Sequence, residues 1–207
     1  MQQDPLGYVD GSSLFWSYAD NPINREDPTG TVTVFMEGLK GLSDTSPATA
    51  ADYPKYAWVD GFFSWADKKA AEKFIRDKVG KPGCQTEPII VLGHSLGGKA
   101  WTVGSDLANE GYTVNFVATL DPVDLAPGTY MMNPKIKLGW NWFQDVGTPA
   151  GVNIAGARNV LDAEGTWGTG VLGTKKNILL HTEIDDDGAI AKEIKDKVDE
   201  IIKAWKP

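Results

Sequence analysis

The chain has 207 residues, 42% of them hydrophobic, which is enough to bury one sizeable core in one main domain. Its net charge of -8 repels nucleic-acid phosphates, so we expect no nucleic-acid partner, and any membrane contact would have to be apolar. The single cysteine, Cys84, excludes an intrachain disulfide. With two histidines and one cysteine we expect no zinc site, no other metal and no cofactor. The first residues lack the basic and apolar regions of a signal peptide, and no apolar run has membrane-spanning length.

Residues 1–30 differ from the rest of the chain, being rich in Asp, Asn, Pro and Gly and lacking a sustained period. Two similar tight turns are predicted, Asp4-Pro5-Leu6-Gly7 and Asp27-Pro28-Thr29-Gly30, because proline presets φ and glycine closes the bend. Residues 13–18 between these turns favour a short strand. Together these features indicate a short β-rich tail from something larger.

From Thr31 onward, strand-like and helix-like segments alternate. Short apolar runs predict strands at residues 31–36, 88–92, 113–120 and 153–160. Apolar residues at helical spacing predict helices at residues 67–79 and 97–109, and a final helix with Ile190, Ile194, Val198, Ile201, Ile202 and Trp205 on one face. Strands that alternate with helices form a parallel sheet covered on both faces, so the predicted fold class is α/β.

The strongest chemical signal is Gly93-His94-Ser95-Leu96-Gly97-Gly98, which follows the apolar run Ile89–Leu92 and leads into the predicted helix. A G-x-S-x-G motif between a strand and a helix is a nucleophile elbow, in which a strained turn exposes the serine Oγ above the sheet. The helix N-terminus aims N–H groups at developing negative charge. We therefore predict that Ser95 is a nucleophile, against the alternative of an incidental serine in a glycine-rich turn.

A serine hydroxyl is a poor nucleophile unless a base takes its proton. Of the two histidines, His94 stands beside Ser95 with its side chain diverging from Oγ, so we expect it to pack under the elbow. His181, late in the chain and after the last strand-like run, is therefore the predicted general base.

A third residue, an acid, should orient the histidine and stabilise its charged form. In α/β-hydrolases the acid lies between serine and histidine in the chain. Asp121, at the end of the predicted strand 113–120, fits best; Asp124 is the first alternative and Asp162 is less well placed. Three further acids follow His181, and we expect them to form a solvated turn or to cap the last helix: Asp185, Asp186 and Asp187.

The oxyanion that forms during acyl transfer needs two N–H donors. One is expected from Leu96, the residue after the nucleophile. The other is expected from the loop at residues 37–41, where we favour Leu39 over Gly38. The alternative for this loop is a plain β-to-α turn.

Residues 32–207 resemble a small lipase of the α/β-hydrolase superfamily. Gly93–Gly98 resembles the elbow sequence of lipases, and Leu120-Asp121-Pro122 resembles the loop that carries their acid. Three later segments resemble a bacterial lipase-like subgroup in which the histidine of an H-T-x-I-D run is the base: residues 141–144, 156–159 and 181–185. The chain departs from many lipases at Glu37, where they carry histidine before the oxyanion glycine. The resemblance implies a mainly parallel central sheet flanked by helices and a serine carboxylic-ester hydrolase.

Residues 1–31 resemble the end of the Rhs repeat core, which closes with two DPxGx motifs at the spacing seen here. The motifs are Asp4–Tyr8 and Asp27–Thr31, separated by residues 9–26. That family uses the first motif in aspartyl autoproteolysis and is cut just after the second. The resemblance therefore implies an autocleavage motif with Asp4, Asp27 and Thr31, and cleavage after Thr31.

Together the two resemblances imply an Rhs-core end at residues 1–31 and a hydrolase toxin domain at residues 32–207. Such an effector is made in the producer's cytoplasm, travels in the Rhs shell through a type VI secretion apparatus and is neutralised by a cognate immunity protein. We expect it to hydrolyse membrane phospholipids from the target's periplasm or membrane surface, with the aromatic stretch at residues 130–143 as a lid or docking surface. The alternative for that stretch is core packing. Alternative functions are an esterase, thioesterase or acyltransferase with a soluble substrate, or a non-catalytic binding module.

Overall fold

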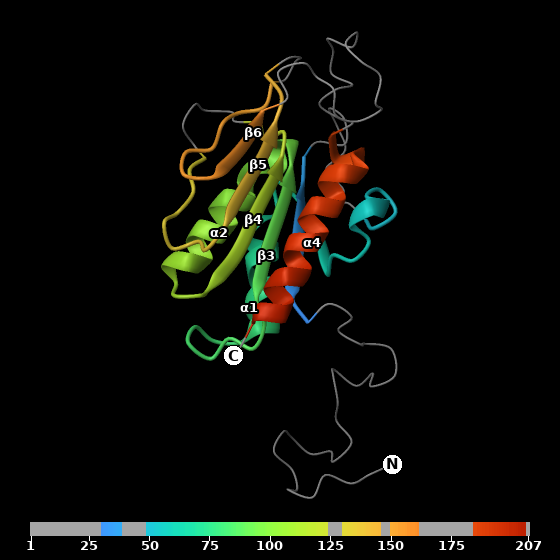
Figure 1. Cartoon of the computed structure of the whole chain (residues 1–207). Coiled ribbons are helices and arrows are strands. Elements are labelled where there is room, and N and C mark those ends of the chain that lie inside the picture. Colours follow the sequence, from blue (N-terminus) through green and yellow to red (C-terminus); the bar gives the residue numbers. More distant parts are fainter. Residues whose placement is uncertain (1–29, 39–48, 124–129, 146–149, 162–183, 206–207) are drawn as a thin grey trace, which may run out of the picture.

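The computed structural model describes residues 30–38, 49–123, 130–145, 150–161 and 184–205 (Figure 1). These residues form a six-stranded sheet in the order β2-β1-β3-β4-β5-β6, and every neighbouring pair is parallel. The strands are β1 (Val32–Glu37), β2 (Gly61–Ser64), β3 (Ile89–His94), β4 (Val114–Leu120), β5 (Gly139–Phe143) and β6 (Arg158–Leu161). Because the strands are parallel, the residues that follow them gather at one edge of the sheet, where ligand sites of such folds lie.

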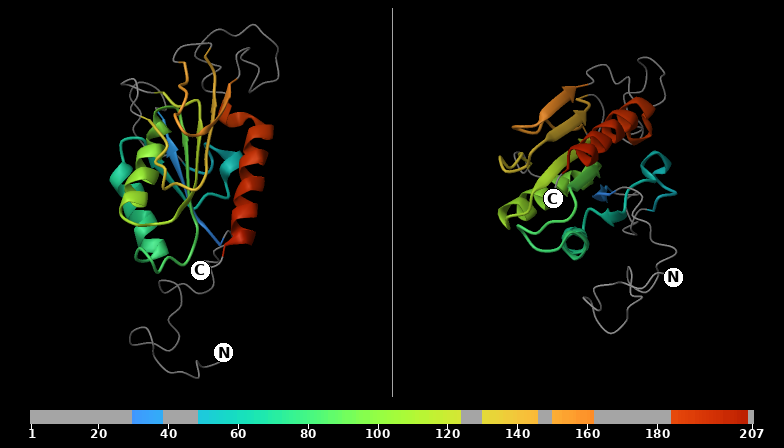
Figure 2. Two further views of the ribbon diagram at one scale, coloured as in Figure 1. Left: turned by 60° about the vertical axis from the view of Figure 1, so that its left-hand side comes forward. Right: turned by 60° about the horizontal axis from the view of Figure 1, so that its bottom comes forward.

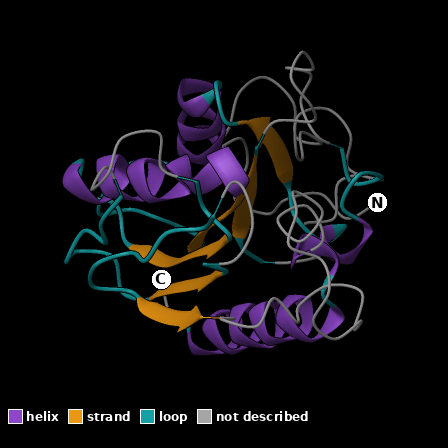
Figure 3. Cartoon of the chain, turned by 90° about the horizontal axis from the view of Figure 1, so that it is seen from above, coloured by secondary structure: helices purple, strands orange, loops and turns teal. Residues whose placement is uncertain are grey.

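Helices cover both faces of the sheet. Figures 2 and 3 show α1 (Lys68–Val79) and α2 (Ala100–Asn109) on one side and α4 (Gly188–Ala204) on the other. Three short 3-10 helices complete the described elements: η1 (Pro54–Tyr56), η2 (Ser95–Lys99) and η3 (Ile184–Asp186). Successive residues of β1 supply the two cores, since Met36 packs with α1 and α2 whereas Phe35 packs with α4. The predicted α/β class, with a parallel sheet flanked by helices, is confirmed.

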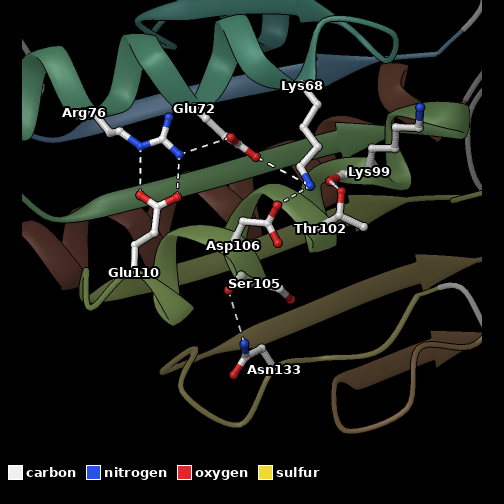
Figure 4. A network of polar contacts seen from close by, with 9 residues as sticks. All are labelled: Lys68, Glu72, Arg76, Lys99, Thr102, Ser105, Asp106, Glu110 and Asn133. Carbon is white, nitrogen blue, oxygen red and sulfur yellow. Dashed lines mark hydrogen bonds and ion pairs between the residues drawn. The ribbon is translucent and has the colours of Figure 1, made fainter.

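Charged side chains join α1 to α2 on the surface (Figure 4). Arg76 donates to both carboxylate oxygens of Glu110, at 2.9 and 2.6 Å, and to Glu72 at 3.1 Å. Lys68 forms an ion pair with Asp106. Exposed pairs of this kind each contribute up to about 1 kcal/mol, so they align the helices while the apolar core supplies most of the stability.

Most predicted elements occur with shifted ends. The predicted helix at residues 97–109 begins as η2, and the predicted strand at 153–160 is shorter, because β6 starts only at Arg158. Two strands, β2 and β5, were not predicted. Of the predicted β-rich tail at residues 1–30, residues 1–29 lie outside the described residues.

The aromatic stretch at residues 130–143 belongs to the core, which corrects the expectation of a docking surface. Tyr130, Trp140, Trp142 and Phe143 are all buried, and the Trp140 ring meets those of Phe116 and Trp142 edge to face. Within this stretch the exposed large hydrophobic side chain is Met131, at 61%. Aromatic rings bury large apolar areas, so core packing is the favourable place for them.

β1 is buried from its first residue, and Thr31, which precedes it, is buried as well. Thr31 has no exposed surface, and its Oγ1 lies 3.0 Å from that of Thr33. The N–H of Val32 donates to the Pro88 carbonyl at 3.0 Å. Thr31 therefore packs with the sheet, and the cleavage after Thr31 that the Rhs resemblance implies stays a prediction.

Candidate active site

β3 delivers Ser95 to the carboxyl edge of the sheet through a strained turn. The strand ends at His94, Ser95 has a φ of 57°, and η2 begins at Ser95 and leads into α2. Glycine is required on both sides, because a Cβ on Gly93 would lie 2.1 Å from the Gly97 carbonyl oxygen and a Cβ on Gly97 would lie 1.9 Å from that of Met36. The backbone therefore has the form of a nucleophile elbow.

Gly38, the first residue after β1, lies against the candidate nucleophile. A Cβ on Gly38 would be 2.5 Å from the Ser95 Cβ and 2.8 Å from its Oγ. The loop after β1, which is predicted to supply the second oxyanion donor, thus begins beside Ser95. Leu96 is buried in η2 directly after Ser95, whereas Leu39 lies outside the described residues.

Asp121 directly follows β4, the strand beside β3, and is 1% exposed. Its Oδ1 accepts the backbone N–H of Gln144 at 2.8 Å. A Cβ on Gly151 would lie 2.0 Å from that oxygen, so glycine leaves room for the carboxylate. The loop after Asp121 reaches the elbow, because the Val123 N–H donates to the Ser95 carbonyl at 3.0 Å.

Ser95 and Asp121 share an unusual backbone conformation. Among the described residues they are the only non-glycine residues with a positive φ, 57° and 44°. Such a conformation costs about 1–2 kcal/mol for a residue with a Cβ, and it persists where the surrounding structure enforces it. Backbone strain of this kind concentrates at functional sites. Here it marks the two residues predicted as nucleophile and acid, at the ends of neighbouring strands.

His181, the predicted base, lies outside the described residues, as do the alternative acids Asp124 and Asp162 and the motif residues Asp4 and Asp27. Among the described residues that follow His181 in the chain, Asp185 lies beside the elbow, because its Oδ2 is 3.9 Å from the Nδ1 of His94, which directly precedes Ser95.

The three acids after His181 have different surroundings. Asp187 accepts two backbone N–H groups of the first turn of α4, at 2.8 and 3.0 Å, so it caps the helix as predicted. The side chain of Asp186 is 66% exposed, as expected for a solvated turn. Asp185 corrects that expectation, because its side chain is only 13% exposed and faces His94. His94 is itself buried, in agreement with its predicted packing.

A buried acid, Glu37, directly precedes Gly38 and contacts the phenol of Tyr53. Glu37 is 2% exposed, and the Tyr53 O–H donates to its Oε1 at 3.3 Å. Burial, with the carboxylates of Glu37 and Asp185, raises the pKa of the Tyr53 phenol far above its ordinary 10.0. The phenol is therefore a donor at neutral pH. Sequence reasoning marked Glu37 only as a departure from lipases and missed Tyr53, which no motif singles out.

The described residues gather no group of three or more His, Cys, Asp or Glu side chains that could hold a metal ion. Within that same part of the chain, no helix has the length and apolar character needed to cross a membrane.

No protein-family model and no curated protein sequence matches the chain. A candidate hydrolase of the alpha/beta superfamily from Xanthomonas campestris pv. campestris is similar in structure, with a TM-score of 0.44 and 11% identity over 84% of this chain and 98% of that one. A predicted CIB-like hydrolase from Thermoplasma acidophilum is similar with a TM-score of 0.45 and 12% identity, over 86% of this chain and 89% of that one. Est1E from Butyrivibrio proteoclasticus is similar with a TM-score of 0.39 and 10% identity, over 85% of this chain and 88% of that one.

These scores are too low to assign a function. The fold class rests on the chain's own architecture, a parallel sheet with helices on both faces and a nucleophile elbow after the central strand β3. That combination is the α/β-hydrolase arrangement.

Proposed function

We propose that this chain is a serine carboxylic-ester hydrolase with Ser95 as nucleophile, His181 as general base and Asp121 as the orienting acid. One observation carries the proposal: the strained Ser95 and Asp121 directly follow the neighbouring strands β3 and β4. Gly38 lies against the Ser95 Oγ, where the oxyanion donors of such enzymes gather.

In the proposed reaction, the Ser95 Oγ attacks the ester carbonyl carbon while His181 takes the hydroxyl proton. The N–H of Leu96 and one from residues 38–39 donate to the oxyanion. Collapse of this intermediate expels the alcohol, which takes the proton from His181, and leaves an acyl-enzyme. Water that gives its proton to His181 then attacks the acyl carbon, releasing the acid and restoring Ser95. Asp121 holds the imidazole in position and stabilises its charged form.

The finer proposal is a phospholipase or lipase toxin of an Rhs effector that acts on membrane phospholipids. Two resemblances support it, the lipase-like elbow at residues 93–98 and the paired turns at residues 4–8 and 27–31. On this proposal the Rhs shell and the secretion apparatus deliver the domain to the target's periplasm or membrane surface. A cognate immunity protein protects the producer.

A second candidate is an esterase, thioesterase or acyltransferase with a soluble substrate. The burial of the aromatic stretch at residues 130–143 favours it, because these rings are not displayed to a bilayer. In the described part of the chain the exposed large hydrophobic residues are Met131 and Leu161, at 61% and 46%, in place of a continuous apolar patch. The same triad serves all these reactions, so only substrate tests separate them.

The test compares the full chain with its Ser95→Ala variant on phospholipid vesicles and on a dispersed short-chain p-nitrophenyl ester. Ser105→Ala is the matched control, because Ser105 is half-buried in α2 and tolerates alanine. Release of fatty acid and lysolipid that requires Ser95 but not Ser105 supports the phospholipase. Ester cleavage without vesicle hydrolysis supports the second candidate. A folded wild-type chain that cleaves neither substrate refutes the proposed function.

A further inference from the structure

Four polar side chains form a buried polar cluster on the α4 side of the sheet: Glu37, Tyr53, His94 and Asp185. The Tyr53 O–H donates to the Glu37 Oε1 at 3.3 Å, and the His94 Nδ1 lies 3.9 Å from the Asp185 Oδ2. The rings of Tyr53 and His94 join the two pairs, with centroids 6.5 Å apart and an edge-to-face angle of 73°. The proposed mechanism uses none of these side chains.

Two members of the buried polar cluster are covalently next to the proposed catalytic groups. In the register of β1 and β3, Met36 is paired with Gly93, so Glu37 and His94 occupy the next positions of these adjacent strands. Glu37 directly precedes Gly38, and His94 directly precedes Ser95. The backbone segments that carry these two side chains therefore lead directly into those on which the proposed reaction depends.

Asp185 joins this cluster from the opposite end of the chain. It lies in η3, just before α4, and its neighbour Asp186 forms an exposed ion pair with Lys55 at 3.2 Å. Adjacent acids on one short helix thus have opposite surroundings. A buried carboxylate is costly unless a charged or hydrogen-bonding group faces it, and His94 supplies such a group.

Resting on the proposed function, we propose that His94 and Asp185 are positioning residues that hold the start of α4 against the elbow. Asp185 lies just before α4 and His94 directly precedes Ser95, so this contact ties the start of α4 to the backbone of the elbow. Neither side chain touches the substrate in this proposal. Their effect passes through the Ser95 backbone, in the way that outer residues orient the ligands of a metal site.

The experiment is a double-mutant cycle on ester hydrolysis by the full chain, with His94→Phe, Asp185→Asn and the double variant. His94→Phe keeps an aromatic ring, and Asp185→Asn keeps the shape of the side chain. Asp186→Asn is the matched control on the same short helix. We expect each single variant to lower kcat about 10- to 100-fold with KM within about twofold, because misplacement by a fraction of an ångström has effects of this size. The double variant should lose no more than the worse single variant, since both changes break one contact.

Two further measurements separate positioning from folding. Urea unfolding shows whether each variant is folded under assay conditions, and a fluorophosphonate that labels Ser95 measures nucleophile reactivity independently of ester binding. His94→Asn, which places an amide near the position of Nδ1, should restore part of kcat if His94→Phe is inactive or unfolded. Wild-type kcat in both single variants, multiplicative losses in the double variant, or an equal loss in Asp186→Asn would overturn the positioning role. If the wild-type chain neither hydrolyses the ester nor reacts with the fluorophosphonate, the proposed function itself fails.

Discussion

Replacing Asp121 with asparagine tests which acid completes the triad. Asparagine has nearly the same shape and keeps an oxygen that can accept the Gln144 N–H, now bound at 2.8 Å. It removes the negative charge that would face the His181 imidazolium. In a serine protease the equivalent change lowers kcat about 10⁴-fold, which corresponds to about 5.5 kcal/mol of transition-state stabilisation. We expect a loss of about 10³- to 10⁴-fold in kcat for Asp121→Asn.

The fold should survive this change, so the loss can be read as catalytic. The Asp121 backbone N–H keeps its bond to the Trp142 carbonyl at 2.7 Å, and an amide in place of a buried carboxylate costs about 1–3 kcal/mol. The assay is kcat for p-nitrophenyl ester hydrolysis, with urea unfolding of the same samples. Asp124→Asn and Asp162→Asn are the comparison variants. More than a tenth of wild-type kcat in Asp121→Asn, or a larger loss in either comparison variant, would refute the assignment.

Three further predictions concern stability and follow from single contacts. Gly97→Ala should lower the free energy of unfolding by about 3 kcal/mol or more in urea titration, because its Cβ would lie 1.9 Å from the Met36 carbonyl oxygen. Asp187→Ala should cost about 1 kcal/mol through loss of the α4 cap, without changing kcat. The Arg76 guanidinium lowers the pKa of the Glu110 carboxyl below 4.5. The ion pair therefore stabilises the fold fully above the ordinary glutamate pKa, and this stabilisation is lost as the pH falls through the lowered pKa. Arg76→Gln removes this contribution, so below about pH 5 its urea midpoint should fall less steeply than that of the wild type.

The sequence was sufficient to predict the elements whose signals are local. The strand that ends at the elbow, the cap at Asp187 and the faces of α1 and α4 each follow from neighbouring residues. β5 was missed because Asn141 interrupts its apolar run. In the fold, Asn141 is fully buried, accepts the Thr119 hydroxyl at 2.8 Å and donates to the Val152 carbonyl at 2.9 Å. Such a buried polar network depends on long-range partners, which periodicity cannot supply.

The residues of the candidate site also divide into those with local sequence signals and those whose surroundings depend on long-range contacts. Ser95 and Asp121 were predicted from a motif and a strand end, because the proposed chemistry depends on local backbone form. Two other features depend on segments that meet only after folding: the room that Gly151 leaves for the Asp121 carboxylate, and the contact of Asp185 with His94. Asp185 was expected in solvent because it begins a run of three acids, a pattern that usually marks an exposed turn. Its low side-chain exposure, 13% against 66% for Asp186, shows that adjacent residues of the same type can have opposite surroundings.

The strain at Ser95 yields a last prediction that separates its backbone role from its chemistry. Ser95→Ala and Ser95→Gly both remove the nucleophile, so both should be inactive. At a φ of 57°, alanine bears a cost of about 1–2 kcal/mol that glycine avoids, whereas glycine loses about 0.5–1 kcal/mol through the greater freedom of its unfolded chain. Ser95→Gly should therefore be the more stable variant in urea by about 0.5–1 kcal/mol. At Ser105, in the middle of α2, the order should reverse, since alanine is favoured over glycine in a helix by about 1 kcal/mol. If the alanine variant is the more stable one at both positions, the elbow is not strained and the main structural argument for Ser95 as the nucleophile is removed.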